Sequence, residues 1–263
     1  MFDLLKKTQY EYSRNEADVW ELFHENSKVD KNKPIVPNDV VIQKMRNELD
    51  TLDYRSFATV ALPETAPTVA LDLASCILNR KSSSEWALTS MTFEELGMLL
   101  QLSYGVTRSN KDTDYVRPFR ACPSGGGLYP LEIFLNVRNV EGLAPGLYHF
   151  NPHKNAVECL REGDQTFKLC SAFVQRQVIE GAACVWMVSG MFRRSTFKYS
   201  NRGYRFALLE AGHLAQNANL VATGLGLGVL NMGGYFDREI DKYLDLNGVD
   251  QSVIYCLAFG RAH

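Results

Sequence analysis

Hydrophobic and polar residues alternate along several segments of the chain and predict the strands of a sheet. The alternation over residues 131–137 predicts one strand, and the turn signal Pro145-Gly146 leads to a returning strand over 147–150. Continuous apolar runs over 183–189 and 253–259 predict two buried strands. Together these segments indicate a central sheet that is mixed or mostly antiparallel.

Other segments have the spacing of helices. Thr92 and Glu95 match a capping box, apolar residues then recur every three or four positions, and Gly105 is the expected end of the helix. A second, long helix is predicted over 204–223, ending at Gly224. This combination predicts an α+β fold in which helices flank the central sheet.

The beginning of the chain has a different character. Charge-rich segments over 15–28 and 38–51 predict helices, and prolines predict an irregular stretch over 58–69. We therefore expect a helical N-terminal extension over residues 1–70 and a main domain over 71–263. The extension could dock a partner protein, recognise a peptide or simply cover the sheet, and the sequence leaves these roles open.

Composition excludes several classes of protein. The 263 residues are 46% apolar and carry 28 basic against 30 acidic side chains, a net charge of −2. A disordered chain would have fewer apolar residues, and a nucleic-acid-binding protein would usually have a basic excess. We therefore expect a globular protein that does not bind nucleic acid.

The cysteines and the hydrophobic segments bear on the compartment. The six cysteines lack C-x-x-C spacing and several lie in apolar runs, which predicts reduced, mostly buried thiols. The polar N-terminus does not resemble a secretory signal, and no apolar stretch approaches the roughly 18 residues that span a bilayer. We expect a cytoplasmic protein that does not associate with membranes.

Several common active-site motifs are missing from the sequence. The five histidines lack metal-ligand spacing, so no metal site is expected, and there is neither a G-x-S-x-G elbow nor a Walker loop. The glycines of Gly224–Gly228 follow a predicted helix, whereas a dinucleotide-binding fingerprint follows a strand and opens a helix. We interpret them as a helix end followed by a tight return.

Two local features point to a ligand. Residues 120–130 read Arg-Ala-Cys-Pro-Ser-Gly-Gly-Gly-Leu-Tyr-Pro, and consecutive glycines allow the backbone to approach a ligand closely. Residues 197–205 are dense in cations and phenols before the long helix, where cations oppose the helix dipole, so the cluster suggests an anion or an active site. Lys198 beside Tyr199 is a reasonable acid–base pair. The alternatives are a flexible surface loop and a solvated helix start.

Further residues extend these features into a family pattern. The motifs Pro123–Glu132 and Val140–His149 resemble those of SagB-type dehydrogenases of the nitroreductase superfamily. Leu78–Ser82, ahead of Met91–Leu96, resembles the phosphate-binding stretch of that family and the helix after it. The likeness covers roughly residues 20–261.

Within this family the chain looks like the McbC-type azoline oxidases of microcin-like peptide maturation, which share its size and the run Phe197–Tyr199. The resemblance implies a nitroreductase-like fold and an FMN-dependent enzyme that oxidises thiazoline or oxazoline rings of a precursor peptide to thiazole or oxazole. It also implies a homodimer with each flavin at the subunit interface. A complex with the cyclodehydratase that forms the rings is implied as well.

The same resemblance assigns roles to individual residues. Lys198 and Tyr199 match the catalytic pair of the family, in which one group is the base and the other orients or stabilises it. The order of these two roles stays open, and the position of a second phosphate-binding arginine in many relatives is Ser84 here. The cofactor-binding residues implied are Arg80, Ser82, Ser84 and Arg261 for the phosphate, and Pro123, Ser124, Gly125, Gly126, Asn217, Gly233 and Gly234 for the rest of the flavin.

Two other functions remain compatible with the sequence. One is a nitroreductase-like enzyme that uses NAD(P)H to reduce a small molecule, and the other is a flavin-binding scaffold without catalysis. The pair Lys198-Tyr199 and the N-terminal extension favour the peptide oxidase over the reductase, and the scaffold stays open.

Overall fold

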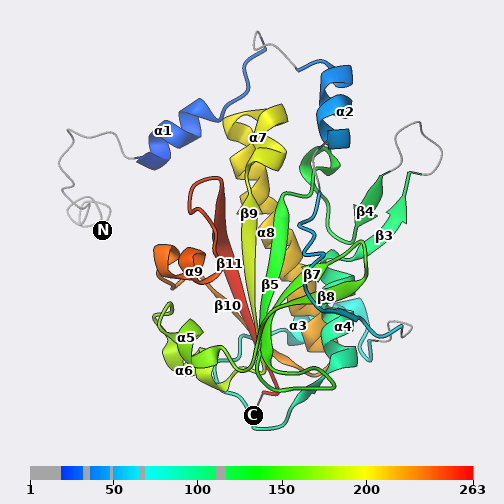
Figure 1. The fold of residues 1–263 in the computed structure, drawn as a ribbon, viewed down its shortest axis with the longest axis vertical. Coiled ribbons are helices and arrows are strands. Elements are labelled where there is room, and N and C mark those ends of the chain that lie inside the picture. Colours follow the sequence, from blue (N-terminus) through cyan, green and yellow to red (C-terminus); the bar gives the residue numbers. More distant parts are fainter. Residues whose placement is uncertain (1–18, 32–35, 48–49, 65–68, 111–116, 263) are drawn as a thin grey trace, which may run out of the picture.

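A central sheet of seven strands organises the structure (Figure 1). The structure is a computed structural model and describes residues 19–31, 36–47, 50–64, 69–110 and 117–262. The strands are β1 (Thr59–Ala61), β5 (Leu131–Val137), β7 (Gly146–Asn151), β8 (Ala156–Glu162), β9 (Cys184–Met191), β10 (Gly228–Met232) and β11 (Gln251–Gly260). Their order across the sheet is β1-β8-β7-β5-β9-β11-β10, and all neighbours are antiparallel. This confirms the expected α+β fold and resolves its sheet as antiparallel.

Two short ladders accompany the sheet in the described part of the chain. One is parallel and joins β2 (Met91–Thr92) to β6 (Val140–Glu141). The other is antiparallel and joins β3 (Val106–Ser109) to β4 (Pro118–Arg120), which is followed by a short 3₁₀ turn, η1 (Gly125–Gly127).

Helices cover both faces of the sheet, and a third group gathers at one end of it (Figure 1). One face is covered by α4 (Phe93–Tyr104) and α8 (Asn201–Gly224), with α3 (Leu73–Asn79) against α8. The other face carries α5 (Thr166–Cys170), α6 (Arg176–Gly181) and α9 (Asp237–Tyr243). At the end where β9 leads into α7 (Arg193–Tyr199), α1 (Val19–Asn26) and α2 (Asn38–Asn47) lie on either side of α7.

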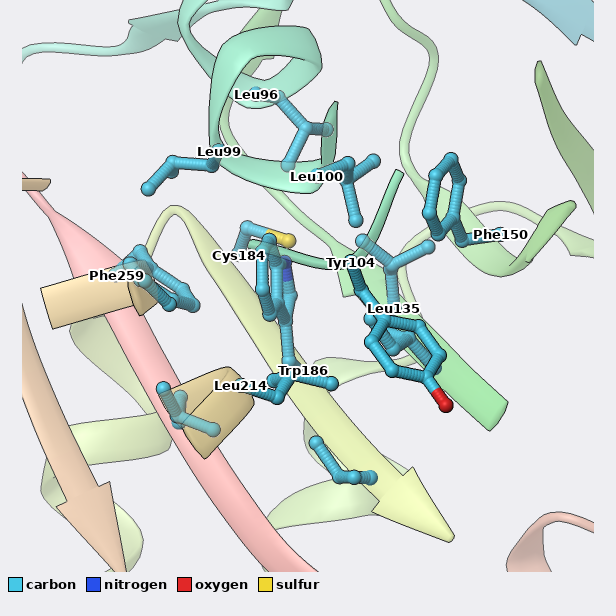
Figure 2. Close-up of a cluster of buried hydrophobic side chains, with 14 of the residues drawn as sticks. Leu96, Leu99, Leu100, Tyr104, Leu135, Phe150, Cys184, Trp186, Leu214 and Phe259 are labelled. Atoms are coloured by element: carbon cyan, nitrogen blue, oxygen red, sulfur yellow. The ribbon is translucent and has the colours of Figure 1, made fainter. Parts of the chain in front are cut away.

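The two covered faces explain why the central strand β9 carries a long apolar run, Cys184–Val188. Trp186 and Val188 of β9 pack into the core under α4 and α8, whereas Val185 and Met187 pack into the core under α5, α6 and α9. Figure 2 shows Trp186 among leucines of α4 and α8. Side chains of a strand alternate between faces, so a strand covered on both sides buries apolar residues at consecutive positions.

The strongest sequence patterns correspond to observed elements. The capping box is present, since the Thr92 hydroxyl accepts the Glu95 N–H at 3.2 Å and the Glu95 carboxylate accepts the Thr92 N–H at 2.8 Å. α4 then ends at Gly105 as predicted. The segments predicted over 131–137, 147–150, 183–189, 204–223 and 253–259 correspond to β5, β7, β9, α8 and β11.

The N-terminal region agrees in part with its prediction. α1 and α2 lie inside the predicted helices 15–28 and 38–51, of which residues 15–18 and 48–49 are outside the described residues. The stretch 58–69 was expected to be irregular, and this is wrong for Thr59–Ala61, which form β1 and pair with β8. A three-residue edge strand is too short to show an alternating pattern, so its pairing partner defines it.

Other expectations concern cysteines, metals and membranes. All six cysteines are free thiols and only Cys159 is not buried. In the described ranges, potential metal ligands do not gather in groups of three or more. None of the helices within those ranges combines the length and the apolar character needed to cross a bilayer.

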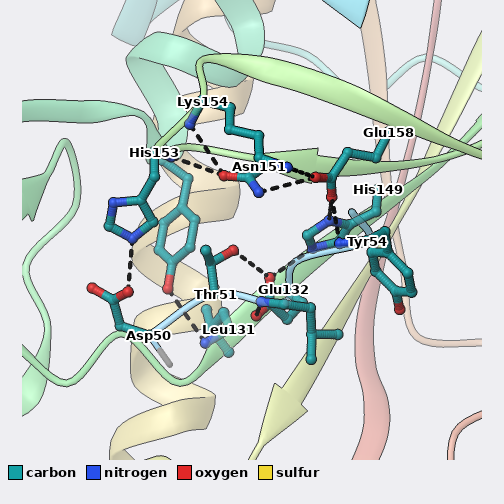
Figure 3. Close-up of polar contacts among 12 residues, drawn as sticks. Asp50, Thr51, Tyr54, Leu131, Glu132, His149, Asn151, His153, Lys154 and Glu158 are labelled. Carbon is teal, nitrogen blue, oxygen red and sulfur yellow. Dashed lines mark hydrogen bonds and ion pairs between the residues drawn. The ribbon is translucent and has the colours of Figure 1, made fainter. Parts of the chain in front are cut away.

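A buried ionic network ties the N-terminal region to the sheet (Figure 3). His149 of β7 bonds Glu132 of β5 at 2.8 Å and Glu158 of β8 at 3.0 Å, and all three side chains are buried. Glu132 also accepts hydrogen bonds from Leu52 N–H at 2.7 Å and from Arg194 of α7 at 2.6 Å. One carboxylate thereby links the sheet, the segment after α2 and the helix α7.

The charges in this network stabilise one another. Burial opposes ionisation of Glu132, but the guanidinium of Arg194 and the hydrogen bond with His149 outweigh it and lower the pKa of Glu132 to about 2. Burial also opposes a charged His149, but the two carboxylates raise the pKa of this ring above its usual value. The network is therefore ionic near neutral pH.

We predict that Glu132→Gln lowers the free energy of unfolding by about 3 kcal/mol at pH 6, because it leaves the buried guanidinium of Arg194 without its anion and leaves His149 with Glu158 as its remaining carboxylate. The loss should be full above pH 4.5, the unfolded-state pKa of Glu132, and should shrink as the pH falls toward about 2, where the wild-type carboxyl is itself neutral. Urea unfolding across this range measures it, with the exposed Glu141→Gln as the matched control.

Candidate active site

A glycine loop joins β4 to β5 and presents its backbone at the end of the sheet. Gly126 and Gly127 have φ angles of 65° and 62°, a region that side-chain-bearing residues rarely adopt. The Ser124 hydroxyl accepts a hydrogen bond from the Tyr129 N–H at 2.9 Å, and the Ser124 carbonyl accepts one from the Gly127 N–H at 3.0 Å. The predicted ligand loop is thus a defined turn held together by Ser124.

This glycine loop lies against the predicted catalytic pair. A Cβ at Gly126 would overlap the Tyr199 hydroxyl and would lie 3.1 Å from the Lys198 ammonium nitrogen. A Cβ at Gly125 would lie 2.8 Å from the ring of Phe206 in α8. Two motifs that are distant in the sequence therefore form one site, and the absence of side chains on the loop permits their contact.

The pair occupies the corner between α7 and α8. Ser200 has a φ of 49° where α7 ends and α8 begins, which turns the chain sharply after Tyr199. The ammonium of Lys198 is 5.1 Å from the centre of the Tyr199 ring, and that ring meets Phe206 edge to face with centres 5.0 Å apart. Both side chains of the pair are only partly buried, so a ligand can reach them.

The arginines that follow the pair contact the N-terminal region of the chain. The Arg202 Nε donates to the Ser27 carbonyl at 2.6 Å, and Arg205 donates to the Ser27 hydroxyl and to the His24 carbonyl at 3.5 Å. These oxygens lie at the C-terminal end of α1, where carbonyls lack helical partners and the helix dipole is negative. The cations therefore anchor α1 across the first turns of α8.

A buried polar cluster that the sequence did not reveal lies beside the glycine loop and bonds the chain where the loop enters β5. Tyr104 of α4 donates to the Glu210 carboxyl at 2.7 Å and accepts the Leu131 N–H at 3.3 Å. The Arg120 guanidinium stacks on the Tyr104 ring at 4.5 Å and donates to the Asp50 carbonyl at 2.6 Å. The sequence pattern that could have indicated the cluster is Glu210, an acidic residue on a helix face that is otherwise apolar at Ala207, Ala211 and Leu214.

Glu210 is the titratable group of this cluster. Its side chain is buried on α8, and burial raises its pKa to about 7 although hydrogen bonds with Ser124 and Tyr104 and the charge of Arg120 oppose the rise. The carboxyl is therefore close to half-protonated at neutral pH. The carboxyl accepts the hydrogen bond of Tyr104, whose hydroxyl also accepts the Leu131 N–H at the start of β5.

The predicted phosphate stretch lies elsewhere, beside the start of β10. Ser82 forms a bridge with Val229, and the Ser83 N–H donates to the Val229 carbonyl at 3.0 Å. A Cβ at Gly228 would lie 2.9 Å from the Ser83 side chain, so this stretch packs closely on the strand. Arg80, Ser82 and Ser84 are exposed there, and among the described residues the Arg80 side chain has no ion pair.

Arg261 and Asn217 lie near other partners. The Arg261 guanidinium forms an ion pair with the Glu95 carboxylate, with nitrogen–oxygen distances of 2.7 and 2.9 Å. Asn217 donates weakly to the Ser103 carbonyl at 3.5 Å from a half-buried position on α8. Arg261 would have to share its guanidinium with Glu95 in order to bind a phosphate.

The remaining predicted flavin residues are accessible. Pro123 is exposed beside the glycine loop. Gly233 and Gly234 are exposed after β10, where a Cβ at Gly233 would meet nothing within 4 Å and one at Gly234 would only touch Val174. A backbone approach to a ligand is open at both glycines.

The predicted catalytic pair and the predicted phosphate stretch lie at opposite ends of α8. Lys198 and Tyr199 directly precede this helix, whereas its last residue, Gly224, packs against α3 and leads to Gly228 beside the phosphate stretch. The 24 residues of α8 correspond to about 36 Å of helix. The structure brings the glycine loop and the predicted catalytic pair together, but it does not bring the predicted phosphate stretch to them within one chain.

The fold and these motifs have counterparts in known proteins. The model of the nitroreductase family matches residues 77–261. The chain belongs to the nitroreductase family. It is therefore an oxidoreductase of a flavin-dependent family. A protein of Methanocaldococcus jannaschii named as a nitroreductase, MJ1384, is 34% identical over 176 residues, which cover 67% of this chain and 85% of that protein.

Other family members bear on the specific reaction. The microcin B17-processing protein McbC of Escherichia coli is 36% identical over 146 residues, 53% of this chain and 52% of that protein. A crystal structure of an Anabaena variabilis protein described as a nitroreductase has a TM-score of 0.70 and 25% identity, and the match covers 89% of this chain and half of that one. A chain of the E. coli microcin synthetase McbBCD complex, with 23% identity and a TM-score of 0.60 over 93% of this chain and 92% of that one, shares the fold.

We predict that Glu210→Gln removes a pH dependence from stability. The wild-type carboxyl favours the folded state most below its unfolded-state pKa of 4.5, and this contribution is lost as the pH rises through about 7. Relative to the variant, the wild type should lose about 3 kcal/mol of unfolding free energy over that interval. Urea titrations at pH 4.5, 6 and 7.5 measure the loss, with the exposed Glu239→Gln as control.

Proposed function

We propose that this nitroreductase-family protein binds FMN and oxidises thiazoline or oxazoline rings of a modified peptide to thiazole or oxazole. The observation that carries the proposal is the contact of Gly126 with Lys198 and Tyr199, which combines a flavin-type glycine loop with an acid–base pair. The 36% identity to a protein named for processing microcin B17 supports the choice of a peptide substrate.

The residues of the phosphate stretch fit the cofactor. Arg80 offers an exposed guanidinium, Ser82 and Ser84 offer exposed hydroxyls, and the close packing of Ser83 on Gly228 fixes their backbone. A guanidinium with neighbouring hydroxyls is suited to a phosphate dianion. When bound, FMN supplies N5 as the hydride acceptor.

The catalytic pair supplies the proton chemistry. Aromatising an azoline removes one proton and one hydride from neighbouring ring carbons, so the protein must provide a base and orient the ring. One member of the pair removes the proton, and the other orients or stabilises it. Gly125 and Gly126 carry no side chains, so a flat ring can approach the pair across the loop.

We infer that the working unit is a homodimer. The phosphate stretch and the pair are separated by the length of α8 in one chain, so the two groups would serve one flavin if they came from two chains. Association with cyclodehydratase subunits and a precursor peptide is proposed from the microcin relatives, one of which is solved in a complex with a truncated pro-peptide bound.

A second candidate is an NAD(P)H-dependent reductase of small molecules, favoured by the match to the M. jannaschii relative, which covers 67% of this chain and 85% of that protein. Anaerobic flavin bleaching separates the two functions. Rapid bleaching by NADPH together with a flavin that stays yellow in the presence of an azoline peptide would support the reductase. Bleaching by the azoline peptide supports the oxidase.

We predict that Lys198→Ala reduces azole formation at least 100-fold, because general acid–base groups contribute about 10²- to 10⁴-fold to a rate. Mass spectrometry follows the reaction as a loss of about 2 Da per ring, the mass of the two hydrogens removed. The exposed Lys242→Ala should keep the wild-type rate. Unchanged azole formation in Lys198→Ala would show that the assigned pair is wrong, and a wild type that binds flavin without oxidising rings would support a scaffold.

We predict that Arg80→Ala weakens FMN binding about 10- to 100-fold, the value of one charge-assisted hydrogen bond. Fluorescence quenching of FMN on titration with apoprotein measures the dissociation constant. The exposed Arg176→Ala serves as a control for the loss of one positive charge. Equal affinities of the two variants would remove Arg80 from the phosphate site.

A further inference from the structure

A cavity of about 440 Å³ opens beside the catalytic pair. Lys198, Tyr199 and Phe206 line one side of it, and the other side is formed by residues 26–29 together with Val36 and Asn38. This second wall belongs to the N-terminal extension, at the C-terminal end of α1 and the beginning of α2. The extension therefore contributes directly to the space in which a substrate of the pair would lie.

The backbone of this wall is fixed in place. Ser27 is 1% exposed, its carbonyl accepts the Arg202 Nε hydrogen bond at 2.6 Å, and its hydroxyl accepts one from Arg205. Phe23, one turn earlier, packs edge to face on Tyr204 with ring centres 5.5 Å apart. The anchoring residues belong to α8, so the wall keeps its position relative to the pair.

The side chains that follow Ser27 are available to a ligand. Val29 is 71% exposed and the side chain of Lys28 is 53% exposed, although its ammonium forms an ion pair with Glu25. An exposed ion pair of this kind contributes little and exchanges readily for another anion. The wall thus offers an apolar side chain and a cation on an anchored backbone.

The lining of the cavity favours one class of ligand. The described residues that line it include three cations, Lys28, Lys198 and Arg202, and no carboxylate, in a chain whose net charge is −2. Concentrated positive charge attracts carboxylates and carbonyl oxygens. Val29 and Phe206 add apolar surface, and cavities of roughly 300–1,000 Å³ accommodate ligands larger than a single five-membered ring.

We propose that this cavity binds the peptide segment next to the azoline ring and prefers a carboxylate side chain in that segment. The inference rests on the proposed function and gives the N-terminal extension a substrate-binding role. Val29 contacts the apolar part of the segment, and Lys28 exchanges Glu25 for the carboxylate. Lys198 and Tyr199 then meet the ring at the inner end of the cavity.

The first test fills the cavity. The probe is a fluorescein-labelled thiazoline peptide with Glu next to the ring, and fluorescence anisotropy measures its binding. Val29→Trp should raise the dissociation constant and KM about 10-fold, with kcat within twofold and the FMN content unchanged. Val19→Trp, at the exposed far end of α1, should behave as wild type. Unchanged binding in Val29→Trp, or a loss of FMN from it, would overturn the proposal.

The second test addresses charge. Peptides with Glu, Gln or Lys next to the ring should bind wild type in that order, and Lys28→Glu should reverse the order of Glu and Lys. An order that is the same in both proteins would overturn the carboxylate preference. Anisotropy needs no turnover, so a failure of the proposed function shows separately, as a wild type that binds the peptide without the loss of about 2 Da per ring.

Discussion

The buried carboxylate of Glu132 is the interaction on which the arrangement of the site depends. It lies on β5 and receives hydrogen bonds from His149 of β7, from the backbone at Leu52 and from Arg194 of α7. An apolar residue at this position could fill the space but could not fix the direction of three polar groups. Hydrogen bonds to a charged group are also roughly twice as strong as neutral ones. The carboxylate therefore determines how α7 and the N-terminal segment meet the sheet.

The position of the proposed catalytic pair follows from this arrangement. α7 begins at the end of β9, is held at Arg194 by Glu132, and ends at Lys198 and Tyr199. The glycine loop enters β5 only a few residues before Glu132. The loop and the helix α7 that carries the pair are therefore both attached to the sheet near this carboxylate. The buried Glu210 supports the loop from the opposite side, on α8. The buried carboxyl groups of Glu132 and Glu210, whose pKa values are shifted in opposite directions, thus lie beneath the glycine loop and the pair.

The sequence predicted the parts of the fold that carry strong local signals. Alternation identified β5, the capping box identified α4, and apolar runs identified β9 and β11. β1 was missed because its identity depends on pairing with β8. The glycine loop and the pair were recognised as separate motifs, but their contact is a tertiary event with no local signature. Glu132, His149 and Glu210 were not assigned roles, since a polar residue in an apolar strand or helix reveals its partners only after folding.

The arginines after the pair show what the charge pattern alone does not reveal at this site, namely the contacts of these side chains. Read as local sequence, Arg202 and Arg205 suggest an anion site, because cations are unfavourable at a helix start. In the structure they meet the carbonyl end of α1, so the negative end of one helix compensates cations at the beginning of another. The consequence for function is indirect but specific. The cations hold the N-terminal extension beside Lys198 and Tyr199, and the extension becomes a wall of the cavity that these residues face.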